Sequence, residues 1–329
     1  MTEKAIVVDD LKKNFGKVEA LKGISFEVPR GTVFGLLGPN GAGKTTAIRI
    51  LTTILPRDAG VATVLGHDVT READAVRRII GLAGQYAAVD GLLTGSENLR
   101  MIGRLTHLPA DQVRKRAKDL LEQFGLSDAA DRPVRTYSGG MRRRLDLAAA
   151  LVHRPPVLFL DEPTTGLDPQ SRQDLWGMIR DLVADGTTVL LTTQYLEEAD
   201  RLTKEIVVVD QGMIIARGSS AELKAKLGDT VVEMGFADDA TAGNVERLLS
   251  EFKPEREGAL IRLSSAAGAK VLVEVLRTLD AQSLVPATLS VREPSLDDVF
   301  LSITGKHAEA EPEAEQVGRK QMARAGGAR

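Results

Sequence analysis

The chain has 329 residues and a formal net charge of -3, from 43 Lys and Arg against 46 Asp and Glu. Hydrophobic residues make up 43% of it, enough to build a core, so a wholly disordered protein is excluded. The near balance of charge gives no overall attraction to nucleic acid or to an anionic membrane. Cysteine is absent, which excludes disulfides, thiolate metal sites and cysteine nucleophiles.

Membrane-spanning segments are not expected, because no stretch reaches the roughly 18 to 20 apolar residues that a spanning helix needs. The N-terminus begins Thr2-Glu3-Lys4 and shows no apolar signal core. We therefore expect a soluble chain on the cytoplasmic face of the cell membrane, associated with the membrane only through a partner.

Short apolar runs alternate with amphipathic stretches over residues 1–225. Runs rich in Val, Ile, Leu and Thr predict strands at 24–28, 32–37, 157–160, 188–192 and 206–209. Helical periodicity predicts helices at 44–55, 138–151, 171–183 and 195–202. This alternation indicates an α/β fold with a mainly parallel sheet.

Residues 96–125 depart from the alternation, because helix formers and charged residues dominate there and strand signals are almost absent. We interpret this stretch as part of a helical subdomain, at about 94–150, inserted between elements of the sheet.

A second unit is expected at 226–305, a small accessory α+β domain without residues of catalytic type. Strands are predicted at 230–236, 260–263 and 287–291, and helices at 244–252, 267–279 and 295–303. The remaining residues, 306–329, alternate Glu with Ala and Pro and then become basic. Such a composition cannot bury a core, so we predict a disordered charged tail.

A glycine-rich loop lies between a predicted strand and a predicted helix. It reads Gly38-Pro39-Asn40-Gly41-Ala42-Gly43-Lys44-Thr45 and matches G-x-x-x-x-G-K-[ST] at every fixed position. Glycines let backbone N–H groups turn toward phosphate oxygens, and the helix N-terminus adds partial positive charge. Lys44 is expected on the β- and γ-phosphates of a nucleotide, with Thr45 on Mg²⁺ and Thr46 beside it. The motif predicts a P-loop NTPase.

Two carboxylates, Asp161 and Glu162, end the apolar strand predicted at 157–160. Ligands bind at the carboxyl ends of strands in open α/β sheets, so these acids belong beside the loop. Asp161 is predicted to hold Mg²⁺, and Glu162 to polarise the water that attacks the γ-phosphate.

The order of motifs along the chain carries a resemblance. The glycine-rich loop is followed by Gln85, the helical insert, Tyr137-Ser-Gly-Gly-Met141, the Asp-Glu strand and Gly166-Leu-Asp-Pro169. This order resembles the nucleotide-binding subunit of ATP-binding-cassette (ABC) transporters over residues 4 to about 225. The resemblance implies an ATPase with ATP and Mg²⁺ as its ligands.

The resemblance also implies roles for single residues. Phe15 would stack on adenine, and Gln85 would sense the γ-phosphate and Mg²⁺. Ser138, Gly139 and Gly140 would bind the γ-phosphate held by a facing subunit, and Asp168 would contact that subunit. Two chains would then form a homodimer around two ATP molecules.

This sequence departs from the family pattern at one position near the chemistry. Gln194 stands where the family usually has a His that contacts the γ-phosphate. Glutamine can donate a hydrogen bond but carries no proton charge near neutral pH. We therefore predict slower turnover than in a His-bearing relative. Tyr137 and Met141 replace the usual Leu and Gln, and the helix start is expected to survive both.

A narrower resemblance comes from the stretches around Gln194 and Tyr137 and from Pro294-Ser-Leu-Asp-Asp-Val-Phe300. These are similar to the daunorubicin-resistance type of exporter ATPase. The resemblance implies antibiotic resistance through drug export by a separate transmembrane permease, with the helical insert receiving the permease's cytoplasmic helices.

Other functions compete with this one. An ATP-gated dimerising module with little hydrolysis is the main alternative, and import is a rival within the transporter class. The run Arg142-Arg143-Arg144 lacks an aromatic platform, so we favour salt bridges and subunit contacts over nucleic-acid binding. Trp176 is interpreted as packing rather than as a functional stack.

Overall fold

The computed structural model describes residues 3–84, 88–225, 230–265, 269–282 and 284–292, together with 296 and 300. The chain divides into two compact units, one ending at Arg217 and the next beginning at Gly218. The sequence prediction puts the domain boundary after residue 225, and helix α8 (Ser220–Ala225) lies between these two positions.

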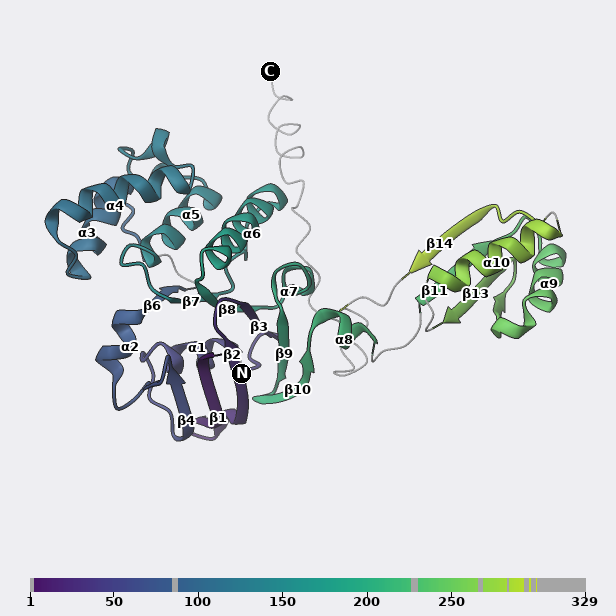
Figure 1. The fold of residues 1–329 in the computed structure, drawn as a ribbon, viewed down its shortest axis with the longest axis horizontal. Helices are drawn as coiled ribbons and strands as arrows, with labels where there is room; N and C mark the ends of the chain where they lie inside the picture. The colour runs from purple at the N-terminus through teal and green to yellow at the C-terminus, as the bar shows by residue number, and fades with distance from the viewer. Residues whose placement is uncertain are drawn as a thin grey trace, which may run out of the picture. The chain divides into compact units, whose positions relative to one another are not determined.

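A six-stranded sheet forms the centre of the first unit (Figure 1). Its order is β10 (Met213–Gly218), β9 (Glu205–Asp210), β3 (Val33–Leu37), β8 (Thr188–Thr193), β7 (Val157–Asp161) and β6 (Ile80–Ala83). β3 pairs in parallel with β8 and β9, and β7 pairs in parallel with β6 and β8. The prediction of an α/β fold with a mainly parallel sheet is confirmed.

Both faces of the central sheet are covered, so alternate side chains of one strand enter different cores. In β7, Val157 and Phe159 belong to the core that includes α1 (Lys44–Leu51). Leu158 and Leu160 belong to the core that includes α5 (Gly139–Ala150) and α6 (Pro169–Ala184). This is why the strand is a continuous apolar run in sequence.

A second, antiparallel sheet packs over α1 in the order β2 (Val18–Pro29), β1 (Lys4–Phe15), β4 (Ala59–Val64) and β5 (His67–Asp68). The sequence analysis predicted only 24–28 of it. β1 was not predicted, because a charged stretch at 9–13 interrupts its apolar residues and leaves this region of the strand largely polar. Helix α1 ends at Leu51 rather than at 55, and Thr53 has a left-handed φ of 64°.

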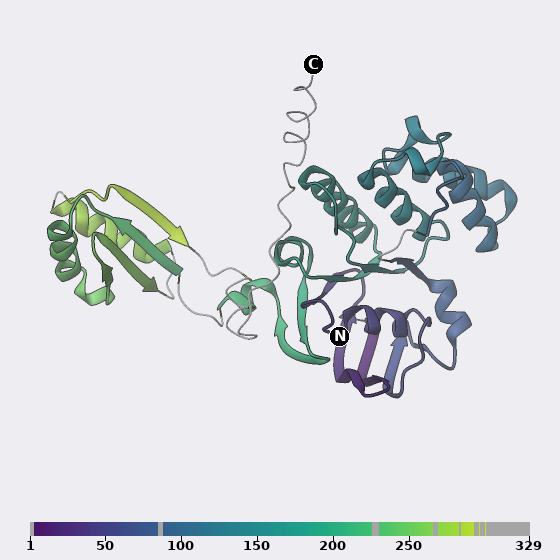
Figure 2. The same ribbon diagram turned by 180° about the vertical axis from the view of Figure 1, so that it is seen from behind.

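The predicted helical insert consists of α3 (Gly95–Leu105), α4 (Ala110–Gln123) and α5, which follow β6 and precede β7. Figures 1 and 2 both show these helices on the side of the central sheet opposite β1, β2 and β4. Thr94 begins α3 with a capping box: its hydroxyl accepts from Glu97 N–H at 3.1 Å, and its own N–H donates to the Glu97 carboxylate at 2.8 Å.

The second unit has its own core under a four-stranded antiparallel sheet. The order is β12 (Glu255–Glu257), β13 (Leu260–Ser265), β11 (Thr230–Gly235) and β14 (Thr288–Arg292), with α9 (Asp239–Leu248) and α10 (Ala269–Ala281) beside it. The helix predicted at 295–303 lies outside the described residues except for Leu296 and Phe300, which are buried. The tail at 306–329 also lies outside them.

In the part of the chain that the structure describes, no helix is both long enough and apolar enough to cross a bilayer.

Candidate active site

The glycine-rich loop joins β3 to α1 as predicted, and its backbone conformation requires glycine at several positions. Gly41 and Gly43 have φ angles of 80° and 108°, in the left-handed region. A Cβ at Gly43 would lie 2.6 Å from the Ala20 carbonyl oxygen, and one at Gly38 would collide with the Val209 carbonyl. The backbone can take this course only with glycine, and the course brings its N–H groups to the start of α1.

Lys44 is nearly excluded from solvent, with a side chain that is 3% exposed. Its ammonium donates to the carbonyl oxygens of Gly38 at 2.7 Å and Pro39 at 3.0 Å, and lies 3.4 Å from the Glu162 carboxylate. The loop therefore folds around its own cation, which phosphate oxygens are suited to engage.

Asp161 receives two hydroxyl groups on one carboxylate oxygen. Thr45 Oγ1 donates to Oδ1 at 3.1 Å, and Thr192 Oγ1 donates to the same atom at 2.6 Å. The parallel pairing of β7 with β8 sets Asp161 opposite Thr192. Thr192 was seen in the sequence only as a strand residue, and a hydroxyl at the end of a strand next to an acidic strand end is the signal that could have identified it.

A hydroxyl and a carboxylate so placed suit Mg²⁺, which is usually held by one or two protein oxygens together with water and substrate phosphates. Among the described residues, no group of three or more His, Asp or Glu side chains is arranged to hold a metal. Thr45 and Asp161 are therefore suited to share a metal with a nucleotide rather than to enclose one alone.

Glu162 follows directly and has a left-handed φ of 50°, which is rare for a residue with a side chain. Its N–H is held by Thr192, by the carbonyl oxygen at 3.2 Å and the hydroxyl at 3.1 Å. This turn carries the Glu162 carboxylate to Lys44, where it is 7% exposed. Local backbone strain of this kind occurs at functional sites and is maintained by the surrounding contacts.

These groups open on a cleft of about 540 Å³. Its lining includes residues 40–46 of the loop, Glu162, and Val18, Glu19, Ala20, Lys22 and Gln211. Phe15 pairs with Val18 across the β1–β2 ladder and is 49% exposed, with the Lys13 ammonium 5.7 Å from the centre of its ring. The ring thus lies next to a residue of the cleft wall, with exposed area left for a planar partner.

A second cluster forms at the starts of α5 and α6. Ser138 is exposed and caps α5, accepting from Met141 N–H at 3.2 Å. Asp168 caps α6, accepting from the Ser171 N–H at 2.9 Å and hydroxyl at 2.6 Å, and these bonds lower its pKa. A Cβ at Gly140 would lie 2.5 Å from Ser171 Oγ, so Gly140 allows the two helix starts to meet. None of these residues lines the cleft.

Two predicted residues remain. Gln85 lies outside the described residues, between Gly84 and Ala88. Gln194 follows β8, and in the described part of the chain its buried carbonyl oxygen Oε1 has no hydrogen-bond partner.

Trp176 is 2% exposed within the core and donates to Glu198 at 3.1 Å, which confirms its interpretation as packing.

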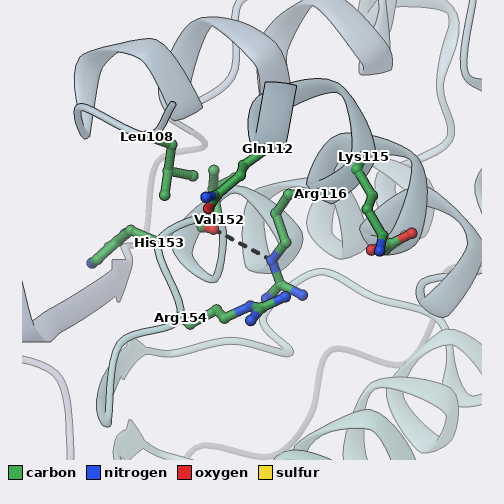
Figure 3. A pocket seen from close by; sticks show the side chains of 8 residues that line it. Leu108, Gln112, Lys115, Arg116, Val152, His153 and Arg154 are labelled. Atoms are coloured by element: carbon green, nitrogen blue, oxygen red, sulfur yellow. Dashed lines mark hydrogen bonds between the residues drawn. The ribbon is translucent and has the colours of Figure 1, made fainter. Parts of the chain in front are cut away.

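The helical subdomain carries a further hollow of about 290 Å³, shown in Figure 3. Arg116 donates to the carbonyl oxygens of Leu151 at 2.8 Å and Val152 at 3.3 Å. The Arg116 and Arg154 guanidinium groups lie close together in Figure 3. Burial lowers the pKa of Arg116, and the charge of Arg154 lowers it further. The hollow is thus cationic, although Asp119 also lines it.

A parallel α/β sheet with a phosphate-binding loop, a paired Asp-Glu strand end and an inserted helical subdomain defines the ATPase class that serves ABC transporters. Residues 21–165 match the family model described as ABC transporter. The ATP-binding cassette MJ1267 of an ABC transporter, in its ADP conformation, has a TM-score of 0.61 and 28% identity, over 67% of this chain and 93% of that chain.

Proteins of similar sequence show which group of these ATPases the chain resembles. The chain is 51% identical over 310 residues to the daunorubicin resistance ATP-binding protein DrrA2 of Streptomyces coeruleorubidus, covering 93% of this chain and 96% of that protein. It is 49% identical over 314 residues to the daunorubicin/doxorubicin resistance protein DrrA of Streptomyces peucetius, covering 93% and 94%. The chain belongs to the ABC transporter ATP-binding proteins, in the daunorubicin-resistance group. It is an ATPase that binds ATP, and ABC ATPases dimerise and pair with transmembrane subunits.

Proposed function

We propose that this chain hydrolyses ATP to drive export of a drug or other hydrophobic compound through a separate transmembrane permease. Lys44, Glu162 and Thr45 line one cleft, and Asp161 accepts a hydrogen bond from Thr45; this arrangement carries the hydrolytic part of the proposal. The export part rests on relatives that align over nearly their whole length and are named for resistance to daunorubicin.

In the proposed reaction, the loop N–H groups and Lys44 bind the β- and γ-phosphates. Glu162 orients a water whose oxygen attacks the γ-phosphorus while the bond from this phosphorus to the β–γ bridging oxygen breaks. ADP leaves with the electron pair of the broken bond, and the proton of the water leaves with the phosphate product. Thr45, Asp161 and Gln85 are the proposed Mg²⁺ residues, and the ion when bound offsets negative charge on the phosphates. Gln194 donates a hydrogen bond near the γ-phosphate, and Phe15 stacks on adenine.

Two copies of the chain form the proposed working unit. Ser138, Gly139, Gly140 and Asp168 form a cluster that takes no part in the cleft of their own chain. The exposed start of α5 presents N–H groups that suit an anion, such as the γ-phosphate in the facing chain. ATP would then hold the homodimer together, and its hydrolysis would release it.

The permease is proposed to dock on the helical subdomain, which places the ATPase at the cytoplasmic face of the membrane. The cationic hollow around Arg116 and Arg154 supports a docking surface that suits acidic side chains. The slightly negative overall charge does not favour nucleic acid as a partner, and the run of arginines at 142–144 lacks an aromatic platform.

An ATP-gated dimerising module with little hydrolysis is the second candidate, and Gln194 is the observation that favours it. The test is ATP turnover by the chain and by Glu162→Gln, each reconstituted with its transmembrane permease. Turnover that the substitution abolishes while ATP binding is kept supports the motor. Negligible turnover in both proteins favours the switch.

The cargo needs its own experiment. A strain lacking the gene should become more sensitive to amphipathic drugs and retain more of them. Unchanged sensitivity and efflux across a panel of such drugs would contradict the export proposal but leave the ATPase assignment intact.

A further inference from the structure

A buried ion pair on α5 connects segments that the active site uses. Arg143 and Asp146 lie one helical turn apart, with Nη1 3.3 Å from Oδ2 and side chains that are 13% and 1% exposed. Burial lowers the pKa of Arg143 and raises the pKa of Asp146, and each charge offsets part of that effect on the other. Burying such a pair is costly, and removing one partner would leave the other charge buried without compensation.

All three nitrogens of the Arg143 guanidinium donate hydrogen bonds. Nε donates to the Pro163 carbonyl at 2.6 Å, and Nη2 donates to the carbonyls of Asp161 at 3.2 Å and Glu162 at 3.1 Å. Nη1 donates to the Gly84 carbonyl at 2.6 Å as well as to Asp146. The five N–H groups of an arginine are thus all used, across three segments of the chain.

Asp146 extends this network, because its Oδ1 accepts from the Ala88 N–H at 2.7 Å. The ion pair therefore holds both Gly84 and Ala88, which flank Gln85 in the sequence. It holds them against the backbone at 161–163, where the metal-binding and catalytic carboxylates are proposed to lie.

The strained turn at Glu162 explains what the hydrogen bonds of Arg143 can do. Thr192 holds the Glu162 N–H, and Arg143 holds the Glu162 carbonyl. The peptide groups on both sides of a left-handed Cα are therefore fixed. Without Arg143 the Glu162 carbonyl keeps a longer bond from the Thr165 N–H, at 3.4 Å, so the strained turn that places the carboxylate beside Lys44 is held less firmly.

We propose that Arg143, paired with Asp146, is a positioning residue that fixes Glu162 for hydrolysis and ties its geometry to Gly84 and Ala88. The inference rests on the proposed role of Glu162. Arg143 does not line the nucleotide cleft, so ATP binding does not depend on it while turnover does.

The test is Arg143→Lys in the full chain. Lysine keeps the charge for Asp146, but its single ammonium cannot reach all four carbonyls, which belong to two separate segments. The rate constant kcat is expected to fall at least about tenfold, since displacing a catalytic group by about 1 Å can cost about a hundredfold. The dissociation constant for ATP is expected not to rise, because Arg143 does not line the cleft and a Glu162 carboxylate held less firmly beside Lys44 competes less with the phosphates.

Arg180→Lys is the control. Arg180 is an exposed residue of α6 and does not line the nucleotide cleft. This variant is expected to keep kcat within about twofold of the unaltered chain. Hydrogen exchange across 157–167 gives a readout without turnover, and it should be faster in Arg143→Lys than in Arg180→Lys.

Asp146→Asn is the second variant, because asparagine keeps the shape of the side chain and removes its charge. Its kcat is expected to fall as in Arg143→Lys. Equal kcat and equal exchange in Arg143→Lys and its control would overturn the proposal. Loss of ATP binding in both Arg143→Lys and Asp146→Asn would also overturn it, by showing a general structural role. If Glu162→Gln itself retains turnover, the proposed function fails instead.

Discussion

The ammonium of Lys44 lies 3.4 Å from the carboxylate of Glu162, and both side chains are nearly excluded from solvent. Lys44 is thus shared between loop carbonyls and a negative charge. ATP phosphates would compete with Glu162 for the same cation, so the residue proposed to orient water is also an electrostatic competitor of the substrate.

Glu162→Gln is therefore expected to bind ATP more tightly while losing turnover. Removing the carboxylate charge frees Lys44 for the phosphates, and a tightening of about three- to tenfold is the expected scale for an interaction of about 1 kcal/mol. Titration with ATP checks this against Glu197→Gln, an exposed position on α7 (Leu196–Leu202) that should leave affinity unchanged. Weaker binding in Glu162→Gln would contradict the competition.

Gln194→His should speed hydrolysis. The buried Oε1 of Gln194 lacks a partner in the described part of the chain, and an imidazole can both donate to the γ-phosphate and carry positive charge. We expect kcat to rise several-fold, which is less than the roughly hundredfold or more that a general acid–base group contributes. The double variant with Glu162→Gln should remain inactive. An unchanged or lower rate in the single variant would count against this interpretation of Gln194.

Gly140→Ala tests the contact between the starts of α5 and α6. The added Cβ would lie 2.5 Å from Ser171 Oγ and 3.0 Å from Ser171 Cβ. Overpacking of this kind costs about 1–3 kcal/mol, and thermal unfolding should show it. Gly139→Ala is the control for stability, because a Cβ there has no neighbour within 4 Å. Equal melting temperatures for the two variants would show that Ser171 moves without cost.

The stability that the capping box of α3 contributes should be measurable by a single substitution. Thr94→Ala removes the hydroxyl that accepts from Glu97 N–H, and about 1 kcal/mol of stability should be lost. Thr94→Ser keeps the acceptor and should restore most of it. Denaturant unfolding provides the comparison, and no difference between Ala and Ser would mean that Thr94 does not stabilise the helix start.

Asp68 should make the first unit sensitive to acid. Hydrogen bonds from the Arg57 guanidinium and from backbone N–H groups lower its pKa to about 2, from an ordinary 3.8. Because the folded-state value is the lower one, the stabilisation is complete above pH 3.8 and is lost as pH falls toward 2. The shift corresponds to about 2 kcal/mol.

Asp68→Asn should accordingly lower the melting temperature at pH 7, and the difference from the unaltered chain should shrink as the pH falls from 4 toward 2. Asp74→Asn removes an exposed carboxylate of α2 (Ala73–Ile79) and provides the control. A difference that is constant with pH would contradict the depressed pKa.

Local sequence was enough to predict the elements that carry the phosphate chemistry. The loop at 38–45 is a contiguous motif whose glycines are required by backbone conformation, and β7 is continuously apolar because both of its faces are buried. The antiparallel sheet was largely missed, since β1 shifts register against β2 between Val8 and Leu11 and its buried residues therefore do not alternate regularly.

The sequence alone determined that this chain is an α/β ATPase of the ABC type, because its motifs are short and act through backbone geometry. Only the tertiary structure decided which distant groups meet: Thr192 on Asp161, Ser171 against Gly140, and Arg143 across three segments. Such contacts depend on strand order and on the packing of helices over the sheet. A hydroxyl or a guanidinium has no local pattern that reveals which carbonyl or carboxylate will face it.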